Sequence, residues 1–260
     1  MSGIVSAIRT LTVFRIPGKD APSLATAMPW FPLVGAILGS MLYGVYLLFS
    51  IIFPDWIFLT AMVVLLAQTG FTGAIHLDGL ADSADALFSM KDKARKLEIL
   101  KDSRLGTFGV LALIGSLMLK WLLLCKLMES GEMQLIIVAM ILSRTVQVDL
   151  AATLSYARAD SGTAKRFVTD ASSKHRLIAW LAALFFVAGF GPLCAAAIVV
   201  AFITGKYLSL WFKRQLGGVT GDLLGASSEI VEMAMLFLFS AWLHHFGWLH
   251  WPWALWLRSI

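Results

Sequence analysis

The chain has 260 residues, of which 59% are hydrophobic and only 14% are charged, and its mean hydropathy is +0.81. A soluble domain carries about 25% charged residues, so this composition excludes an ordinary soluble enzyme and predicts a polytopic membrane protein. The excess of 21 Lys and Arg over 16 Asp and Glu concerns membrane topology, and we expect no nucleic-acid partner. Cys125 and Cys194 both lie in apolar runs, so neither a disulfide nor a zinc site is expected.

Residues 1–27 are expected to form an N-terminal interfacial segment. Apolar residues at 4, 5, 8, 11 and 14 form a helical stripe that is too short to span a bilayer. This pattern predicts an interfacial or re-entrant helix. Pro17, Gly18 and Pro22 then break it.

Seven apolar runs follow, and they predict an all-α protein with about seven transmembrane helices in a single helical transmembrane domain, 1–260. The expected spans are 29–53, 56–75, 106–128, 133–154, 177–189, 192–212 and 230–249. With the N-terminus in the cytosol, 16 of the 21 Lys and Arg fall in cytosolic segments, which predicts an N-in, C-out orientation. The polar loops 78–105 and 213–229 are then cytosolic.

The segment 73–87 places three carboxylates, Asp78, Asp82 and Asp85, at the end of the second apolar run. The spacing i, i+4, i+7 puts all three on one helical face, where like charges repel. Mg²⁺ prefers oxygen ligands and bridges carboxylates to phosphates, so the cluster indicates a metal-bound phosphate site. The alternative is a solvated acidic helix end with no ligand.

The following loop, 91–109, adds Glu98 and Asp102, one turn apart, with the donors Lys101 and Arg104 beside them. Its basic half, 91–96, is typical of a helix lying on anionic lipid, but that reading does not account for the two acids.

A second polar segment, 217–229, is rich in glycine and lets a backbone approach a ligand closely. Its candidate binding residues are Gly217, Gly218, Thr220 and Gly221, and Asp222 is a candidate metal ligand. The same pattern is also typical of a routine helix start with an N-cap.

Three further polar residues stand out within or beside the apolar runs. Arg144 and Asp149 are costly in lipid, so they should face the bundle interior, either paired or lining a substrate entry. His76 precedes Asp78 and either contacts phosphate or is a satisfied buried histidine. The tail carries His244, His245 and His250 among tryptophans and is typical of an interfacial aromatic belt.

Three ordered motifs carry a family resemblance. Residues 72–85, 98–107 and 217–226, at these spacings, resemble the cobalamin-5′-phosphate synthase (adenosylcobinamide-GDP ribazoletransferase) family, and the resemblance covers nearly the whole chain. Ala74 departs from the pattern, because a second glycine is common there.

The resemblance implies a Mg²⁺-dependent enzyme of the bacterial cytoplasmic membrane, with its active site facing the cytosol. It would join adenosylcobinamide-GDP to α-ribazole or its 5′-phosphate, giving adenosylcobalamin or its 5′-phosphate and GMP. Asp78, Asp82 and Asp85 would lead the metal ligands, completed by Glu98, Asp102 and Asp222, with Asp85 as general base and Lys101 and Arg104 stabilising the leaving group.

Other assignments remain open at this point. A CDP-alcohol phosphotransferase-like lipid enzyme also uses an Asp-rich helix with Mg²⁺, but with longer gaps between its acids. A secondary transporter would place its polar groups near the bilayer midplane on broken helices. The family also leaves open a homo-oligomer or a complex with other nucleotide-loop enzymes.

Overall fold

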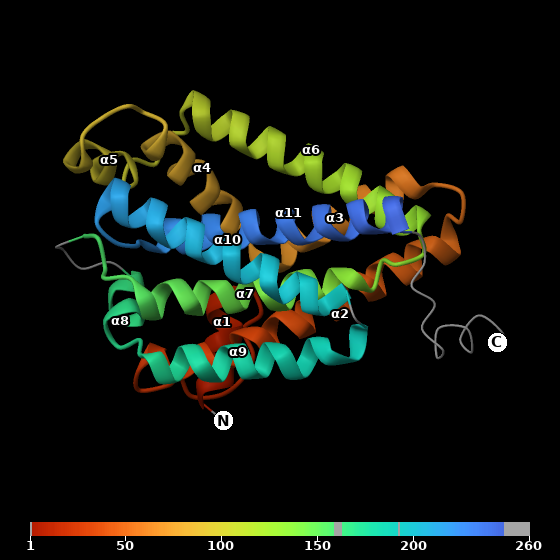
Figure 1. Cartoon of the computed structure of the whole chain (residues 1–260), viewed down its shortest axis with the longest axis horizontal. Coiled ribbons are helices and arrows are strands. Elements are labelled where there is room, and N and C mark those ends of the chain that lie inside the picture. Colours follow the sequence, from red (N-terminus) through yellow and green to blue (C-terminus); the bar gives the residue numbers. More distant parts are fainter. Residues whose placement is uncertain (1, 159–162, 192, 247–260) are drawn as a thin grey trace.

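The computed structural model describes residues 2–158, 163–191 and 193–246. Regular structure in these residues is helical, and the only strand-like contact among them is one isolated bridge between Tyr156 and Val219. The longer helices run roughly along the long axis of the molecule (Figure 1). The elements are α1 (Ser2–Leu11), η1 (Leu24–Trp30), α2 (Phe31–Ile52), α3 (Ile57–Thr72), α4 (Ile75–Leu87), α5 (Lys93–Ile99), α6 (Thr107–Glu129), α7 (Leu135–Thr153), α8 (Thr163–Thr169), α9 (Ser173–Val187), η2 (Ala188–Phe190), α10 (Leu193–Leu216) and α11 (Gly221–Phe246).

The prediction of an all-α polytopic membrane protein is confirmed. Six segments within the described residues are long and apolar enough to cross a membrane, or seven if the bent pair α3–α4 counts as one span. The first of them, Ala25–Ile52, consists of most of η1 together with α2. The others are α6, α7, α9 with η2, α10 and α11. The N-terminal helix was also expected, and α1 forms it over Ser2–Leu11.

Helix α7 forms the centre of the bundle, with 89% of its most apolar stretch buried. Small residues let its neighbour α2 approach closely. A Cβ at Gly35 would lie 2.5 Å from the Met140 carbonyl oxygen, and one at Gly39 would lie 2.6 Å from the Ile137 Cα. Such close backbone contact is the usual basis of helix packing where lipid removes the hydrophobic driving force.

The second expected span does not run straight to Ile75. Its axis bends by 89° between α3 and α4. Gly73 and Ala74 form the bend with φ values of 61° and 58°, both left-handed, which is a conformation that glycine adopts without cost. The bend is the physical reason why glycine suits position 74 and why Ala74 is strained there.

The last helix begins at Gly221, earlier than the expected start at Ile230, so the polar residues 221–229 are helical and only 217–220 form a turn. The described part of the chain ends at Phe246. His250 and the rest of the tryptophan-rich tail therefore lie outside the described residues.

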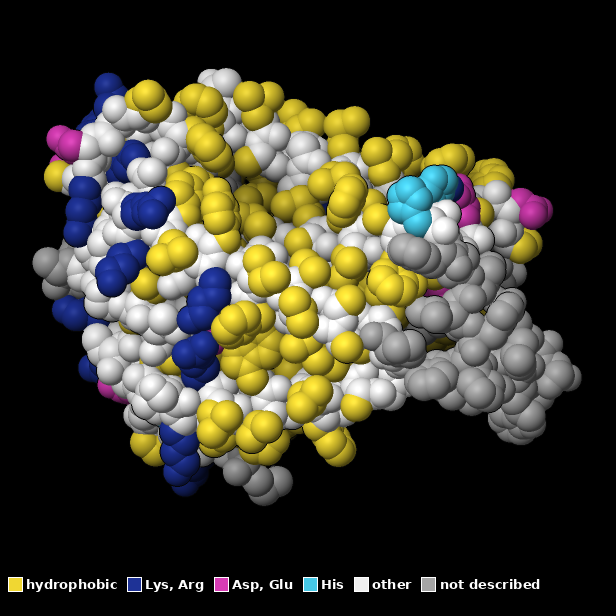
Figure 2. All heavy atoms as spheres, in the orientation of Figure 1, with side chains coloured by type: hydrophobic (Ala, Val, Ile, Leu, Met, Phe, Trp, Pro, Cys, Tyr) yellow, Lys and Arg dark blue, Asp and Glu magenta, His cyan; other side chains and the backbone are white. Residues whose placement is uncertain are grey.

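Charge separates along the long axis. Lys and Arg gather at the end that carries α5, α8 and the turn between α10 and α11, whereas hydrophobic side chains cover the middle of the molecule (Figures 1 and 2). We call this the basic end. The α2–α3 and α6–α7 connections lie at the opposite end (Figure 1).

Candidate active site

Helix α4 carries the three predicted carboxylates towards the basic end. Asp78 is exposed, and Asp82 and Asp85 are half-buried. All three lie within one continuous α-helix, as their spacing predicted. Among the described residues, neither Asp78 nor Asp82 has a hydrogen-bond or ion-pair partner. Both side chains are therefore available to a ligand.

Helix α11 packs closely against α4 because glycines remove the side chains between them. A Cβ at Gly79 would lie 2.6 Å from the Asp222 carbonyl oxygen, and one at Gly225 would lie 3.3 Å from the His76 Cα. This contact brings the first turn of α11 beside the acidic face of α4. The charged neighbours of Asp82 are consequently Asp78, Asp85, Asp222 and Arg158.

Arg158, which follows α7, ties three segments together. Its Nη2 donates to the Asp222 carboxylate at 2.7 Å and to the Leu100 carbonyl oxygen at 2.9 Å. The Thr220 hydroxyl lies 3.2 Å from the same Asp222 oxygen. The site thus has one guanidinium held beside the carboxylates, and a guanidinium is a group suited to binding phosphate oxygens.

Asp85 has a different environment from the other two acids. Its two oxygens accept backbone N–H groups of Gly106 at 2.7 Å and Gly109 at 2.8 Å. Asp85 therefore caps the N-terminus of α6 from another helix. Its carboxylate provides hydrogen-bond acceptors for two N–H groups at that helix end. Sequence reasoning did not anticipate this, because the cap and the helix are 21 residues apart.

The glycine-rich turn 217–220 owes its composition to packing. The turn pairs with the segment that follows α7 through two backbone hydrogen bonds. The Ala157 N–H donates to the Val219 carbonyl oxygen at 3.0 Å, and the Val219 N–H donates to the Ser155 carbonyl oxygen at 2.9 Å. A Cβ at Gly218 would lie 2.1 Å from the Ser155 carbonyl oxygen, and Gly217 has a φ of 73°. Thr220 is buried, and its hydroxyl accepts the Leu223 N–H at 3.3 Å as the N-cap of α11. Gly221 begins the helix.

The two acids predicted on the 91–109 loop pair with neighbouring arginines. Glu98 binds Arg95 at 2.6 Å, and Asp102 accepts from Arg104 at 2.6 Å. The hydrogen bonds from Arg104 hold the pKa of Asp102 at about 2. Lys101 is exposed beside them. These residues lie at the basic end, but each acid is already engaged with a cation.

The basic half of this loop is not simply a lipid-facing helix. Lys96 is buried, and its ammonium donates to the Gln215 side chain. The Lys93 ammonium lies over the backbone of Gly217, where an added Cβ would come within 2.6 Å of it. Helix α5 is therefore docked on the end of α10 and the glycine-rich turn.

A charged cluster in the bundle interior was not identified from the sequence. Lys120 lies between Glu229 at 2.6 Å and Glu232 at 2.9 Å, and all three side chains are at most 3% exposed. Gln68 donates to both Glu232 oxygens. Charged residues within membrane spans usually pair with each other. This rule could have predicted a pairing of Lys120 with Glu229 and Glu232 from the sequence.

Arg144 and Asp149 do not pair with each other. Arg144 is fully buried, and its Nη1 donates to Ser143 at 2.8 Å and to Ser228. Asp149 instead binds Arg176 and accepts from the Trp180 indole at 2.9 Å. Arg144 and Asp149 both face the bundle interior, as expected. The possibility that they pair with each other is wrong, because each has other partners.

His76 is buried near Arg144 and Lys120, and its Nδ1 has no hydrogen-bond partner among the described residues. It lies on the inner side of α4, against Gly225 of α11. The structure therefore separates His76 and Arg144 from the exposed Asp78.

The donor set on α4 and α11 suits a hard cation. Carboxylate oxygens are the ligands that Mg²⁺ prefers, and it commonly keeps water or substrate oxygens as its other ligands. No group of three or more His, Cys, Asp or Glu is close enough to hold a metal in the described part of the chain. Asp78 and Asp82, whose side chains have no partners there, are candidate ligands, and phosphate oxygens of a substrate would supply others.

Comparison with known proteins gives a consistent result. The family model described as cobalamin-5-phosphate synthase matches residues 3–240. A protein of Chlorobaculum tepidum named adenosylcobinamide-GDP ribazoletransferase is 40% identical over 95% of this chain and 98% of its own length. Proteins with the same name from Chlorobaculum parvum and Fusobacterium nucleatum are 39% and 34% identical over 94% and 92% of this chain, and 96% and 97% of their own lengths. No solved structure matches. The match of the family model over almost the entire chain, together with these relatives, shows that the chain belongs to the cobalamin-5-phosphate synthase family.

Proposed function

We propose that this membrane protein is a phosphotransferase that joins adenosylcobinamide-GDP to α-ribazole or its 5′-phosphate, giving adenosylcobalamin or its 5′-phosphate and GMP. The shared name of relatives that align over at least 90% of both chains supports this activity. The observation in the structure that carries it is the acidic face of α4, with Asp82 placed among Asp78, Asp222 and Arg158.

The reaction exchanges a phosphoanhydride bond for a phosphoester bond. A ribose hydroxyl oxygen of the ribazole forms a bond to the phosphorus that bears the cobinamide, and the bond from that phosphorus to the oxygen of GMP breaks. The hydroxyl loses its proton, and GMP leaves with the bridging oxygen. Phosphoryl transfer of this kind depends mainly on positioning and charge stabilisation.

Asp82 and Asp222 are the residues that would hold Mg²⁺, whose charge would neutralise the pyrophosphate. Asp78, which is exposed and whose side chain has no partner among the described residues, would accept the hydroxyl proton. Both oxygens of Asp85 already accept backbone N–H groups of α6, so its contribution is to position that helix. Arg158, Arg104 and Lys101 stabilise negative charge on the phosphates and on the departing GMP.

We place the basic end in the cytosol of a bacterial cell, with the protein in its cytoplasmic membrane. The support is the concentration of Lys and Arg at that end (Figure 2). A cysteine at Met90, which is 94% exposed, should react with an impermeant thiol reagent only from the cytosolic side. Asp55→Cys at the opposite end serves as the control, and both native cysteines are buried. Labelling of the 90 position from outside would reverse this topology.

The activity is tested directly with purified protein in detergent, adenosylcobinamide-GDP, α-ribazole and Mg²⁺. We expect GMP to be released in step with the joined product, and release to stop when the metal is chelated. Turnover of a CDP-alcohol with release of CMP would instead support a lipid phosphotransferase. Movement of substrate across vesicle membranes without any GMP would indicate a transporter, and either result would overturn the proposal.

A further inference from the structure

A cavity of about 470 Å³ lies between α4, α6, α10 and α11, outside the cluster of carboxylates. Its volume falls in the range of small-molecule sites, about 300–1,000 Å³. The surface between α4, α6 and α10 is hollowed and hydrophobic on the face shown in Figure 2. Nothing in the proposed chemistry of the carboxylates uses this cavity.

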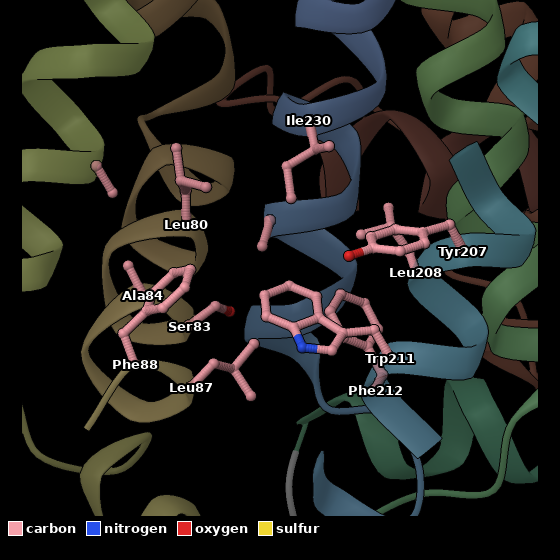
Figure 3. A pocket seen from close by; sticks show the side chains of 12 residues that line it. Leu80, Ser83, Ala84, Leu87, Phe88, Tyr207, Leu208, Trp211, Phe212 and Ile230 are labelled. Carbon is pink, nitrogen blue, oxygen red and sulfur yellow. The ribbon is translucent and has the colours of Figure 1, made fainter. Parts of the chain in front are cut away.

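Aromatic rings form much of its wall. Phe88, which directly follows α4, and Trp211 of α10 lie next to each other, with ring centroids 6.0 Å apart. Tyr207 lies one turn before Trp211 on α10, and all three side chains line the cavity (Figure 3). The two ring planes are inclined by 50°, so an aromatic ligand in the cavity could meet one ring face to face and another edge to face.

The cavity also contains a buried polar group that lacks a partner. Ser83 is 3% exposed, and its hydroxyl has no hydrogen-bond partner among the described residues. Figure 3 shows this hydroxyl, the Tyr207 oxygen and the Trp211 indole nitrogen directed into the space between α4 and α10. Leaving a buried hydroxyl unsatisfied is costly, so a ligand with a matching polar atom would be favoured.

We propose that this cavity binds the heteroaromatic base of the α-ribazole substrate, an inference that rests on the proposed function. A benzimidazole-type base is flat and apolar, and once one ring nitrogen carries the ribose, the other offers a single acceptor. The cavity matches it with rings and with groups that can donate, and none of the described residues that line it is charged. Guanine fits less well, because its several N–H groups need hydrogen-bond acceptors and the side chains that line the cavity are mainly apolar.

The cavity lies next to the carboxylates of α4. Ser83 follows Asp82 directly, and consecutive residues on an α-helix point about 100° apart. The hydroxyl of Ser83 therefore enters the cavity while Asp82 faces α11 and Arg158. A base held here leaves its ribose at the edge of α4, beside the carboxylates that would activate its hydroxyl.

A lipid acyl chain is the competing occupant, because the cavity lies among helices that cross the membrane. An acyl chain has no polar atom to meet the Ser83 hydroxyl, and it gains little from stacked rings. The unpartnered hydroxyl therefore favours the base over the acyl chain.

Two variants test the site. Ala226→Leu fills the cavity from α11, and Ser83→Ala removes the hydroxyl while keeping a residue that favours helix. Ala182→Leu on α9 and Ser50→Ala at the opposite end of the molecule are the matched controls. Equilibrium dialysis of α-ribazole and of free benzimidazole, with protein in nanodiscs and without adenosylcobinamide-GDP, measures binding without turnover.

We expect Ala226→Leu to weaken binding of both probes by about tenfold or more, and Ser83→Ala to weaken it about fivefold, as for loss of one hydrogen bond. In the complete reaction, KM for α-ribazole should rise while KM for adenosylcobinamide-GDP stays within about twofold. If Ala226→Leu does not fold, Ser83→Ala decides the matter alone.

Unchanged dialysis binding in the folded variants, or equal increases in both KM values, would overturn the inference. So would a co-purifying acyl chain that is lost from Ala226→Leu while the affinity for α-ribazole is kept. If the wild-type protein binds α-ribazole and the variants do not, but no GMP is ever formed, the cavity stands and the proposed reaction fails.

Discussion

Gly79 on α4 lies directly against Asp222 on α11, with room for a hydrogen atom but not for a methyl group. A Cβ at position 79 would come within 2.6 Å of the Asp222 carbonyl oxygen and 3.1 Å of its Cα. Because both contacts are with backbone, a side chain there cannot be accommodated by a rotamer change. The contact thus sets the distance between the acids of the two helices.

Gly79→Ala should therefore separate α4 from α11 and lower turnover by at least tenfold, with the protein still inserted. The rate of GMP release checks this, because small displacements in a reacting constellation are costly. Gly115→Ala on α6 is the control, since no atom lies within 4 Å of its added Cβ. Equal activity of the two variants would show that helix spacing does not govern the site.

Asp82→Asn should reduce turnover by roughly 10³-fold or more, because it removes charge at the place where phosphate charge is balanced. Thermal stability without Mg²⁺ should hold or rise, since one of several neighbouring negative charges is lost. The increase in melting temperature on adding Mg²⁺ should shrink, because weaker binding gives less stabilisation.

Asp55→Asn, an exposed change at the opposite end, is the matched control for Asp82→Asn. A solvated acidic helix end would give the reverse pattern, with near-normal turnover and an unchanged response to Mg²⁺. That outcome would remove Asp82 from the proposed metal site.

Asp85→Asn should act mainly on the start of α6. The carboxylate accepts two N–H groups, and hydrogen bonds to a charged group contribute about 1.5–3 kcal/mol each to stability. We expect a lower melting temperature with an unchanged Mg²⁺ concentration for half-maximal activity. Gly109→Ala should reproduce the loss, because its Cβ would lie 2.4 Å from the Asp85 carboxylate. A large increase in the Mg²⁺ requirement of Asp85→Asn alone would instead make it a ligand.

Lys120→Met should destabilise the bundle by about 3–5 kcal/mol, because it leaves buried Glu229 and Glu232 without their cation. Thermal unfolding in detergent measures the change. Adding Glu229→Gln to the same protein should recover much of the loss, because the remaining acid, Glu232, still has the buried Arg144 guanidinium as a charged neighbour. Failure of this rescue would mean that the charges themselves are needed.

Ala74→Gly should stabilise the bend between α3 and α4 by up to about 1 kcal/mol, because glycine adopts a φ of 58° without strain. Gly73→Ala is the opposite test: it adds strain at a φ of 61° and places a Cβ 2.8 Å from Val13 Cγ1. Melting temperatures should therefore move in opposite directions. A lower melting temperature for Ala74→Gly would contradict the bend as described.

The local part of the site could be predicted from the sequence, and the long-range part could not. Asp78, Asp82 and Asp85 share one helix because their spacing follows the helical period. The same period says nothing about which amides Asp85 meets, because those belong to a helix that starts at Thr107. Whether Glu98 and Asp102 bind a metal likewise depends on competition from Arg95 and Arg104, which spacing alone does not resolve.

The fold class followed from composition and hydropathy, but the helix ends did not. Gly221 begins α11 because Thr220 caps it, and this polar first turn carries no hydropathy signal. Lys120 could be recognised as a charge that needs a partner. Its pairing with Glu229 and Glu232 required knowing that α6 and α11 are neighbours.

The ion pair between Arg158 and Asp222 joins residues 64 positions apart, with α8, α9 and α10 between them. A ribosome adding about 5–20 residues per second makes Asp222 roughly 3–13 s after Arg158. Until then Arg158 lacks its ion-pair partner Asp222, and the acidic face of α4 lacks the helix that packs against it. A chain released before α11 can therefore enter the membrane with most of its helices and still have no complete site, so activity reports on full-length synthesis rather than on insertion alone.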